Sequence, residues 1–90
     1  MAEITVTPIN QTLFCVEVKE KGSTTVHEVT ASPADIKRYG GEVAAERLLT
    51  LSFEFLLERE PKESILRSFE LPVIERYFQE YPREIRKRVG

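Results

Sequence analysis

Apolar side chains recur at every second position in two early runs of the chain, residues 4–6 and 14–18. A third run, rich in Thr and Val, spans residues 24–30. Successive side chains of a strand point to opposite faces of a sheet, so each run can present one apolar and one polar face. The pattern therefore predicts three short strands within residues 3–31.

The turns between these runs predict how the strands pair. Lys21-Gly22 separates the second run from the third, and Gly22 can adopt the positive φ that a tight hairpin requires. A three-residue loop at residues 10–12 joins the first two runs, and Pro8 suits an edge strand. The opposed pairs expected from these turns are Val18 with Thr25, Val16 with His27, Phe14 with Val29, Val6 with Val16, and Ile4 with Val18.

The pattern changes to a helical one at Ser32. Ser32 can cap a helix with its side chain, Pro33 suits the first helical position, and Asp35 places a negative charge near the positive end of the helix dipole. We expect a short helix that runs to about Tyr39 and ends at Gly40-Gly41.

Residues 42–59 are expected to form the main helix. Its apolar residues occupy an arc of about 240°, which is wider than the single stripe of a helix that covers one surface. Leu51 and Phe55 lie one turn apart on the outlying flank of this arc. The main helix is therefore expected to be covered twice, by the sheet and by either the later helices or a second subunit.

Three prolines divide the rest of the chain into short segments, because proline fits the first turn of a helix but not its middle. The helical pieces expected are residues 61–69, 72–80 and 82–89. Their expected buried residues are Ile65, Leu66, Phe69, Leu71, Val73, Ile74, Tyr77, Phe78 and Ile85.

Together these elements predict one α+β domain over residues 1–90, with the strands within 3–31 and the helices within 33–89. The expected architecture is a three-stranded antiparallel meander with one face covered by the long helix. Short helices that begin at prolines are expected to close the other side.

Charge and composition narrow the function. Thirteen Lys and Arg against fifteen Asp and Glu give a net charge of −2, which does not favour a polyphosphate partner. The charge is uneven, however: residues 83–90 carry four basic groups and one acid, or +3, which leaves −5 for residues 1–82. One cysteine excludes an intramolecular disulfide and favours a cytoplasmic location; we expect neither a signal peptide nor a membrane segment.

The residue types that carry most enzyme chemistry are scarce. A single His, a single Cys and a single Asp cannot supply the ligands of a zinc site, and the chain has no glycine-rich phosphate loop. His27 and Cys15 are expected on opposite faces of the sheet, and Glu54 and Glu58 on a solvated stripe of the main helix. We therefore expect no catalytic residue, metal or cofactor.

The sequence is compatible with two candidate functions. The first is a small, non-catalytic protein-interaction module that forms a homodimer or binds a protein partner, with Leu51 and Phe55 as the candidate self-association contact. The alternative is weak, sequence-indifferent nucleic-acid binding by the basic end. Its candidate contacts are Arg83, Arg86, Lys87 and Arg88. A helix-turn-helix around Pro61 and an enzyme built from Glu, Arg and Tyr are weaker alternatives.

Overall fold

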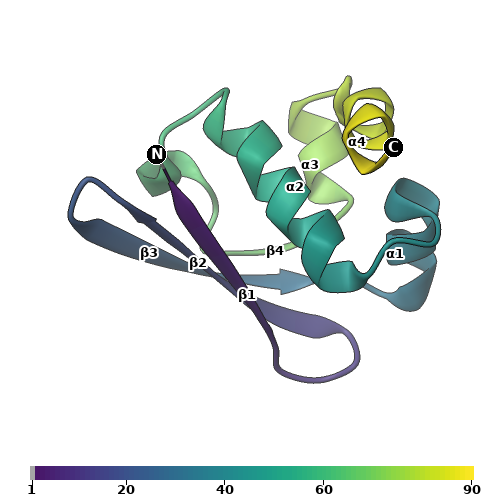
Figure 1. The fold of residues 1–90 in the computed structure, drawn as a ribbon, viewed down its shortest axis with the longest axis horizontal. Helices are drawn as coiled ribbons and strands as arrows, with labels where there is room; N and C mark the ends of the chain where they lie inside the picture. The colour runs from purple at the N-terminus through teal and green to yellow at the C-terminus, as the bar shows by residue number, and fades with distance from the viewer. Residues whose placement is uncertain (1) are drawn as a thin grey trace.

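The three expected strands form an antiparallel meander in the computed structural model, which describes residues 2–90 (Figure 1). They are β1 (Glu3–Pro8), β2 (Leu13–Glu20) and β3 (Ser23–Thr30). All five predicted residue pairs are present in the two ladders. The hairpin and loop signals in the sequence therefore determined the register correctly.

Local interactions in the two turns of the meander explain this register. Lys21 and Gly22 have φ values of 54° and 78°, so both central residues of the β2–β3 turn are left-handed, as the type I′ hairpin requires. In the β1–β2 loop, the side-chain oxygen of Asn10 accepts hydrogen bonds from the backbone N–H groups of Thr12 and Leu13, both at 2.9 Å. These local bonds fix the ends of the strands that they join.

A fourth strand, β4 (Ser68–Glu70), pairs in parallel with β3 and gives the sheet the order β1-β2-β3-β4. The predicted helix over residues 61–69 is therefore wrong, and only the 3-10 turn η1 (Lys62–Ser64) is helical there. Backbone pairing explains the difference: the Glu28 N–H donates to the Arg67 carbonyl at 2.7 Å, and the Leu71 N–H donates to the Thr30 carbonyl at 2.9 Å. An extended segment thereby pairs with β3, whose backbone groups on that side would otherwise lie at a sheet edge.

Helix α1 (Pro33–Gly40) begins as predicted. The Ser32 hydroxyl accepts from the Asp35 N–H at 3.1 Å and the Asp35 carboxylate accepts from the Ser32 N–H at 3.2 Å, which makes a complete capping box. Gly41, with φ 64° and ψ −119°, ends the helix in a conformation that side chains disfavour.

Two of the helices after α1 are shorter than expected. The main helix α2 (Ala45–Leu57) lacks residues 42–44 and 58–59 of the predicted range 42–59, and residues 41–44 form the connection from α1. Helix α3 (Val73–Tyr77) is a short piece of the predicted segment 72–80. Helix α4 (Tyr81–Val89) matches the prediction to within one residue.

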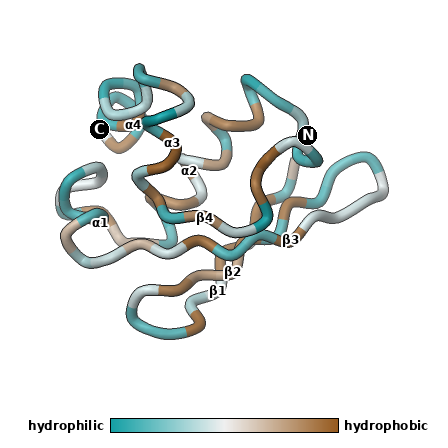
Figure 2. Tube along the Cα trace, turned by 180° about the vertical axis from the view of Figure 1, so that it is seen from behind, coloured by the Kyte–Doolittle hydropathy of each residue, from teal (hydrophilic) through white to brown (hydrophobic). Residues whose placement is uncertain are grey.

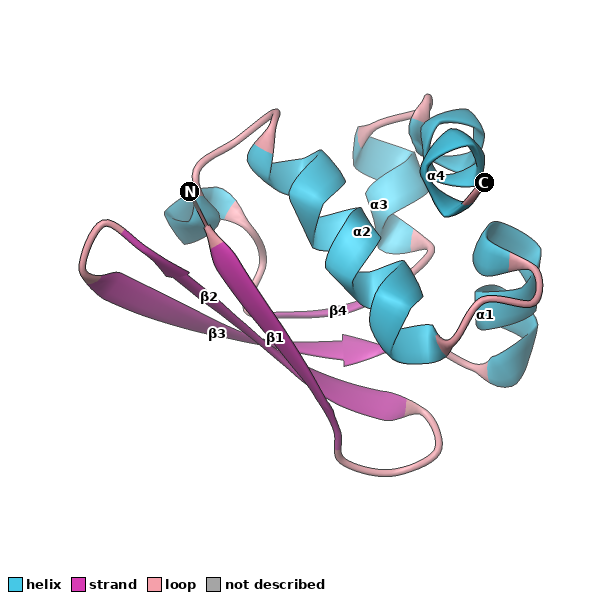
Figure 3. Ribbon diagram, in the orientation of Figure 1, coloured by secondary structure: helices cyan, strands magenta, loops and turns pink. Residues whose placement is uncertain are grey.

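All the helices lie on one side of the sheet (Figures 1 and 3), and the view from behind shows the same two layers with hydrophilic turns at the hairpin ends (Figure 2). The short helices thus do not close the second face of the sheet. That face is polar and open, since alternate strand residues such as Glu17, Lys19 and Glu28 are exposed. The short helices instead pack around α2. The later helices, and not a second subunit, therefore cover its broad apolar arc.

The core lies between the sheet, α2 and the short helices. Its buried residues are Phe14, Val16, Val18, Val29, Ala31, Tyr39, Leu48, Leu49, Leu51, Phe53, Phe55, Leu56, Ile65, Leu71, Ile74, Tyr81 and Ile85. None of the helices within residues 2–90 combines the length and apolar character that crossing a membrane requires.

Candidate functional site

The two residues proposed as a self-association contact lie inside the folded chain. Phe55 is fully buried, and its ring packs against the rings of Phe78 and Tyr81 at centroid distances of 5.9 and 5.3 Å. Leu51 is 9% exposed. The flank of α2 that the sequence left uncovered is therefore covered by residues 78–89, so the breadth of the apolar arc no longer supports an interface there.

The basic end divides into two groups. Arg88 turns inward, donates a hydrogen bond to the Glu58 carboxylate and lies over the Phe55 ring, 5.7 Å from its centroid. Arg83, Arg86 and Lys87 are exposed, with Lys87 3.7 Å from Glu84. Only these three of the four candidate nucleic-acid contacts are free to meet a ligand.

The fold brings one exposed basic residue of α4 close to α1. Arg86, Lys37 and Arg38 line the same surface hollow of about 270 Å³, which we call the basic hollow. Arg38 also forms an ion pair with Glu75 at 3.1 Å. Positive groups from residues almost fifty positions apart thus face one region of the surface.

Cys15 and His27 lie on opposite faces of the sheet, as the register predicted. His27 is fully buried; its Nδ1 lies 2.8 Å from the Leu66 carbonyl oxygen and its Nε2 lies 2.8 Å from the Thr25 hydroxyl. A carbonyl oxygen can only accept, so Nδ1 carries the proton of the neutral ring and Nε2 accepts from Thr25. Burial lowers the pKa of His27, against the opposing effect of the Leu66 hydrogen bond.

Glu58 forms ion pairs with Arg88 and Arg59. The hydrogen bond from Arg88 lowers the pKa of Glu58 and so favours its ionised form. Among residues 2–90, no three His, Cys, Asp or Glu side chains gather into a group that could hold a metal ion.

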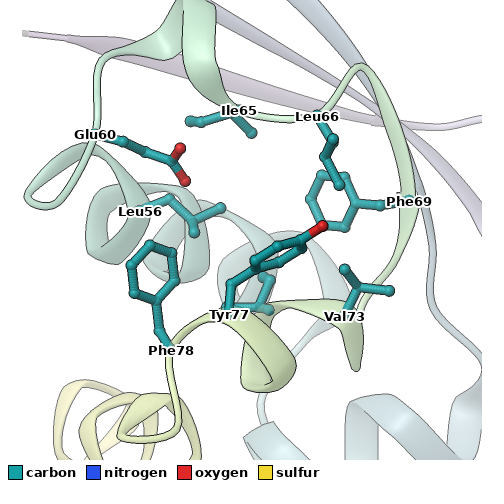
Figure 4. A pocket seen from close by; sticks show the side chains of 9 residues that line it. Leu56, Glu60, Ile65, Leu66, Phe69, Val73, Tyr77 and Phe78 are labelled. Atoms are coloured by element: carbon teal, nitrogen blue, oxygen red, sulfur yellow. The ribbon is translucent and has the colours of Figure 1, made fainter.

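The most distinctive surface feature is an apolar cleft between the end of α2, the segment that leads into β4, and α3 (Figure 4). We call it the α3 cleft. It is open to solvent, leaves room for about 30 Å³, and is lined by Leu56, Glu60, Ile65, Leu66, Phe69, Val73, Ile74, Tyr77 and Phe78. A second hollow of about 180 Å³, lined by Glu60, Ser64, Leu66, Tyr77 and Phe78, adjoins it.

Two large apolar side chains of the α3 cleft face solvent. Leu66 is 45% exposed and Tyr77 is 68% exposed, although both were expected to be buried. The helical pattern of residues 72–80 placed Tyr77 on the same face as Ile74, but α3 ends at Tyr77 and leaves its ring at the surface. Leu66 was assigned to a helix that does not form, so no signal in the sequence indicated its exposure.

His27 connects the sheet to this cleft. Its Nδ1–H group donates to the backbone of Leu66, and its ring packs against Phe53, which also packs against Phe69. The core histidine therefore holds the rim and the floor of the α3 cleft in place. In the fold, His27 positions the Leu66 backbone and the Phe53 ring.

Comparison of the chain with protein-family models, with curated proteins and with solved structures gave no match.

Proposed function

We propose that this protein is a non-catalytic interaction module that binds a protein partner through the α3 cleft. The observation that carries the proposal is the exposure of Leu66 and Tyr77 on the two sides of one apolar depression. Scattered apolar residues are common on protein surfaces, whereas large apolar residues gathered around a concave site are typical of binding surfaces.

The size and lining of the α3 cleft favour a protein partner over a small molecule. Pockets for small ligands and cofactors hold roughly 300–1,000 Å³ and enclose most of the ligand. The cleft leaves room for only about 30 Å³ and the adjoining hollow for about 180 Å³, both open to solvent, which suits one side chain of a partner. Tyrosine is among the residues that contribute most often to the binding energy of protein interfaces.

Site-specific photocrosslinking in the source cells tests the proposal. With p-benzoylphenylalanine in place of Tyr77, we expect irradiation to yield one discrete crosslinked product, because the group lies at the rim of the cleft. The matched control carries the same group in place of Val26, which is 44% exposed on the open face of the sheet. A product of twice the monomer mass identifies the partner as a second copy of the chain.

The Tyr77→Ser variant provides the stability control. Because the side chain is largely exposed, its replacement should change the free energy of unfolding by no more than about 0.5 kcal/mol. Equal crosslinking at positions 77 and 26, or none at position 77, would remove the support for the cleft as a binding site.

The basic hollow supports a second candidate function, the binding of nucleic-acid phosphates. The observation that favours it is the convergence of Arg86 with Lys37 and Arg38, which extends the basic end of α4 onto α1. Phosphate contacts of this kind carry no sequence information, so binding through them would be weak and sequence-indifferent.

Salt dependence tests this second function. The combined variant Lys37→Gln, Arg38→Gln and Arg86→Gln neutralises the three basic residues of the hollow. It should flatten the slope of log K against log salt by up to about 2.7 for duplex DNA, at about 0.9 for each phosphate that the protein no longer neutralises. Fluorescence anisotropy with a labelled duplex measures it. The control is Lys19→Gln, Lys21→Gln and Arg47→Gln, which makes the same charge change at exposed sites elsewhere. If both variants have the same slope, the basic hollow is not a specific phosphate site.

A further inference from the structure

The α3 cleft contains one ionisable carboxylate among its apolar side chains. Glu60 follows the C-terminal end of α2, and its N–H donates to the Leu56 carbonyl at 2.9 Å. Its side chain is half-buried, and the carboxylate turns toward Leu56 and Ile65 (Figure 4). Burial raises the pKa of this carboxyl, which means that its ionised form lacks the solvation that water would provide.

No residue of the described chain neutralises this carboxylate. Within residues 2–90, Glu60 takes part in no ion pair. The two nearest basic residues in sequence are already committed: Arg59 pairs with Glu80 at 3.1 Å, and Lys62 pairs with Glu63 at 2.8 Å. Lys62 is itself buried, and it is not among the residues that line the cleft.

The main helix adds a second source of negative potential at the same place. The carbonyl groups at the C-terminal end of a helix carry a partial negative charge. Arg59 offsets part of it by donating from Nη1 to the Phe55 carbonyl at 3.1 Å, but Arg59 does not line the cleft, whereas Glu60 lies directly beyond the last turn and does. One end of an otherwise apolar cleft is therefore set up to favour a positive charge.

We infer that the α3 cleft binds a protein segment in which a lysine or arginine lies beside a large apolar side chain, with the cation paired to Glu60. This inference rests on the proposed function and specifies its partner. The apolar side chain would pack between Leu66 and Tyr77, and the cation would supply the ion pair that the folded chain leaves unmade. Pairing at a half-buried site gains more than pairing at a fully exposed one, because water screens it less.

The lining of the cleft also argues against symmetric self-association through it. A two-fold interface places the same patch on both subunits. The nine lining residues include Glu60 but no lysine or arginine, so a second α3 cleft offers that carboxylate no cation. A separate basic and apolar segment matches the site better.

Three small probes with the same apolar group test the inference: 4-phenylbutylammonium, 4-phenylbutanol and 4-phenylbutyrate. Titration of the ¹⁵N-labelled protein at pH 7.5, followed by NMR, reports binding through the backbone signals of Leu66 and Tyr77. We expect the ammonium probe to bind about three- to tenfold more tightly than the alcohol, and the carboxylate more weakly than either.

The Glu60→Gln variant should bind the ammonium probe no better than the alcohol, while its affinity for the alcohol stays unchanged. The matched control is Glu70→Gln, which removes an exposed carboxylate on β4 and should retain the full preference. Glu60→Ala serves as a second variant, and the comparison of probes on the unmodified protein stands even if neither variant folds.

The outcomes separate the two proposals. Equal affinity of the unmodified protein for the ammonium probe and the alcohol would overturn the inference and leave the cleft as an apolar binding site. The absence of any shift at Leu66 and Tyr77 with all three probes would contradict the proposed function as well.

Discussion

Replacement of Phe55 by alanine is expected to lower the free energy of unfolding by about 3–5 kcal/mol, as for other large aromatic side chains removed from a core. Phe55 is fully buried and contacts the rings of Phe78 and Tyr81. The Arg59 guanidinium also lies 3.6 Å from the ring centroid. A domain of 90 residues has a total stability of about 5–14 kcal/mol, so this single change removes a large share of it.

Urea denaturation of the variant measures this decrease, and sedimentation equilibrium shows whether its oligomeric state changes. The matched control is Tyr77→Ala, which truncates an aromatic side chain that is 68% exposed and should cost far less. If the variant keeps its stability but changes its association state, Phe55 is an interface residue and not a core residue.

Replacement of His27 by alanine is expected to lower the free energy of unfolding by about 2–5 kcal/mol, the range for large buried side chains. Part of this loss follows from the Leu66 carbonyl, which loses its donor, and from the buried Thr25 hydroxyl, which loses its acceptor. The effect should concentrate on the segment that leads into β4, because His27 fixes the backbone at Leu66. Urea denaturation at pH 7.5 measures the decrease, with the exposed neighbour Glu28→Ala as the control.

Acid provides a second test of the buried, neutral His27 ring. The pKa of His27 is lower in the folded protein than its ordinary value of 6.5, because burial disfavours the charged ring. Between the pKa of His27 in the folded protein and about 6.5, the unfolded chain therefore binds more protons than the folded protein does. The free energy of unfolding falls as the pH decreases through this range. The variant His27→Asn, which can still donate to Leu66, should show a flatter dependence between pH 7 and 5. A stability that rises with acid over this range would contradict the neutral, buried ring.

The sequence predicted the elements that local interactions define. The register of β2 and β3 follows from Lys21-Gly22 and the alternation on either side, and the start of α1 follows from Ser32 and Asp35. Each of these signals lies within a few residues of the structure that it specifies. Local sequence was therefore sufficient for the meander and for the first helix.

The elements that the sequence did not predict depend on distant partners. Strand β4 is only three residues long, and its partner residue Glu28 is forty positions from Ser68. Pro61 favoured the start of a helix locally, but pairing with the edge of β3 outweighed that preference. The α3 cleft could not be predicted for the same reason, because β4 and the early end of α3 create the exposure of Leu66 and Tyr77.

Residues 78–89 cover Phe55, so the chain cannot complete this part of its core until they have been synthesised. Strands β1, β2 and β3 and helix α2 are complete once residue 60 has been made, but the outer flank of α2 stays bare until residues 61–90 follow. At about 5–20 residues per second, these residues take roughly 1.5–6 s to translate. Throughout that interval the nascent chain carries an uncovered apolar helix face, which is the period in which aggregation or chaperone binding competes most strongly with folding.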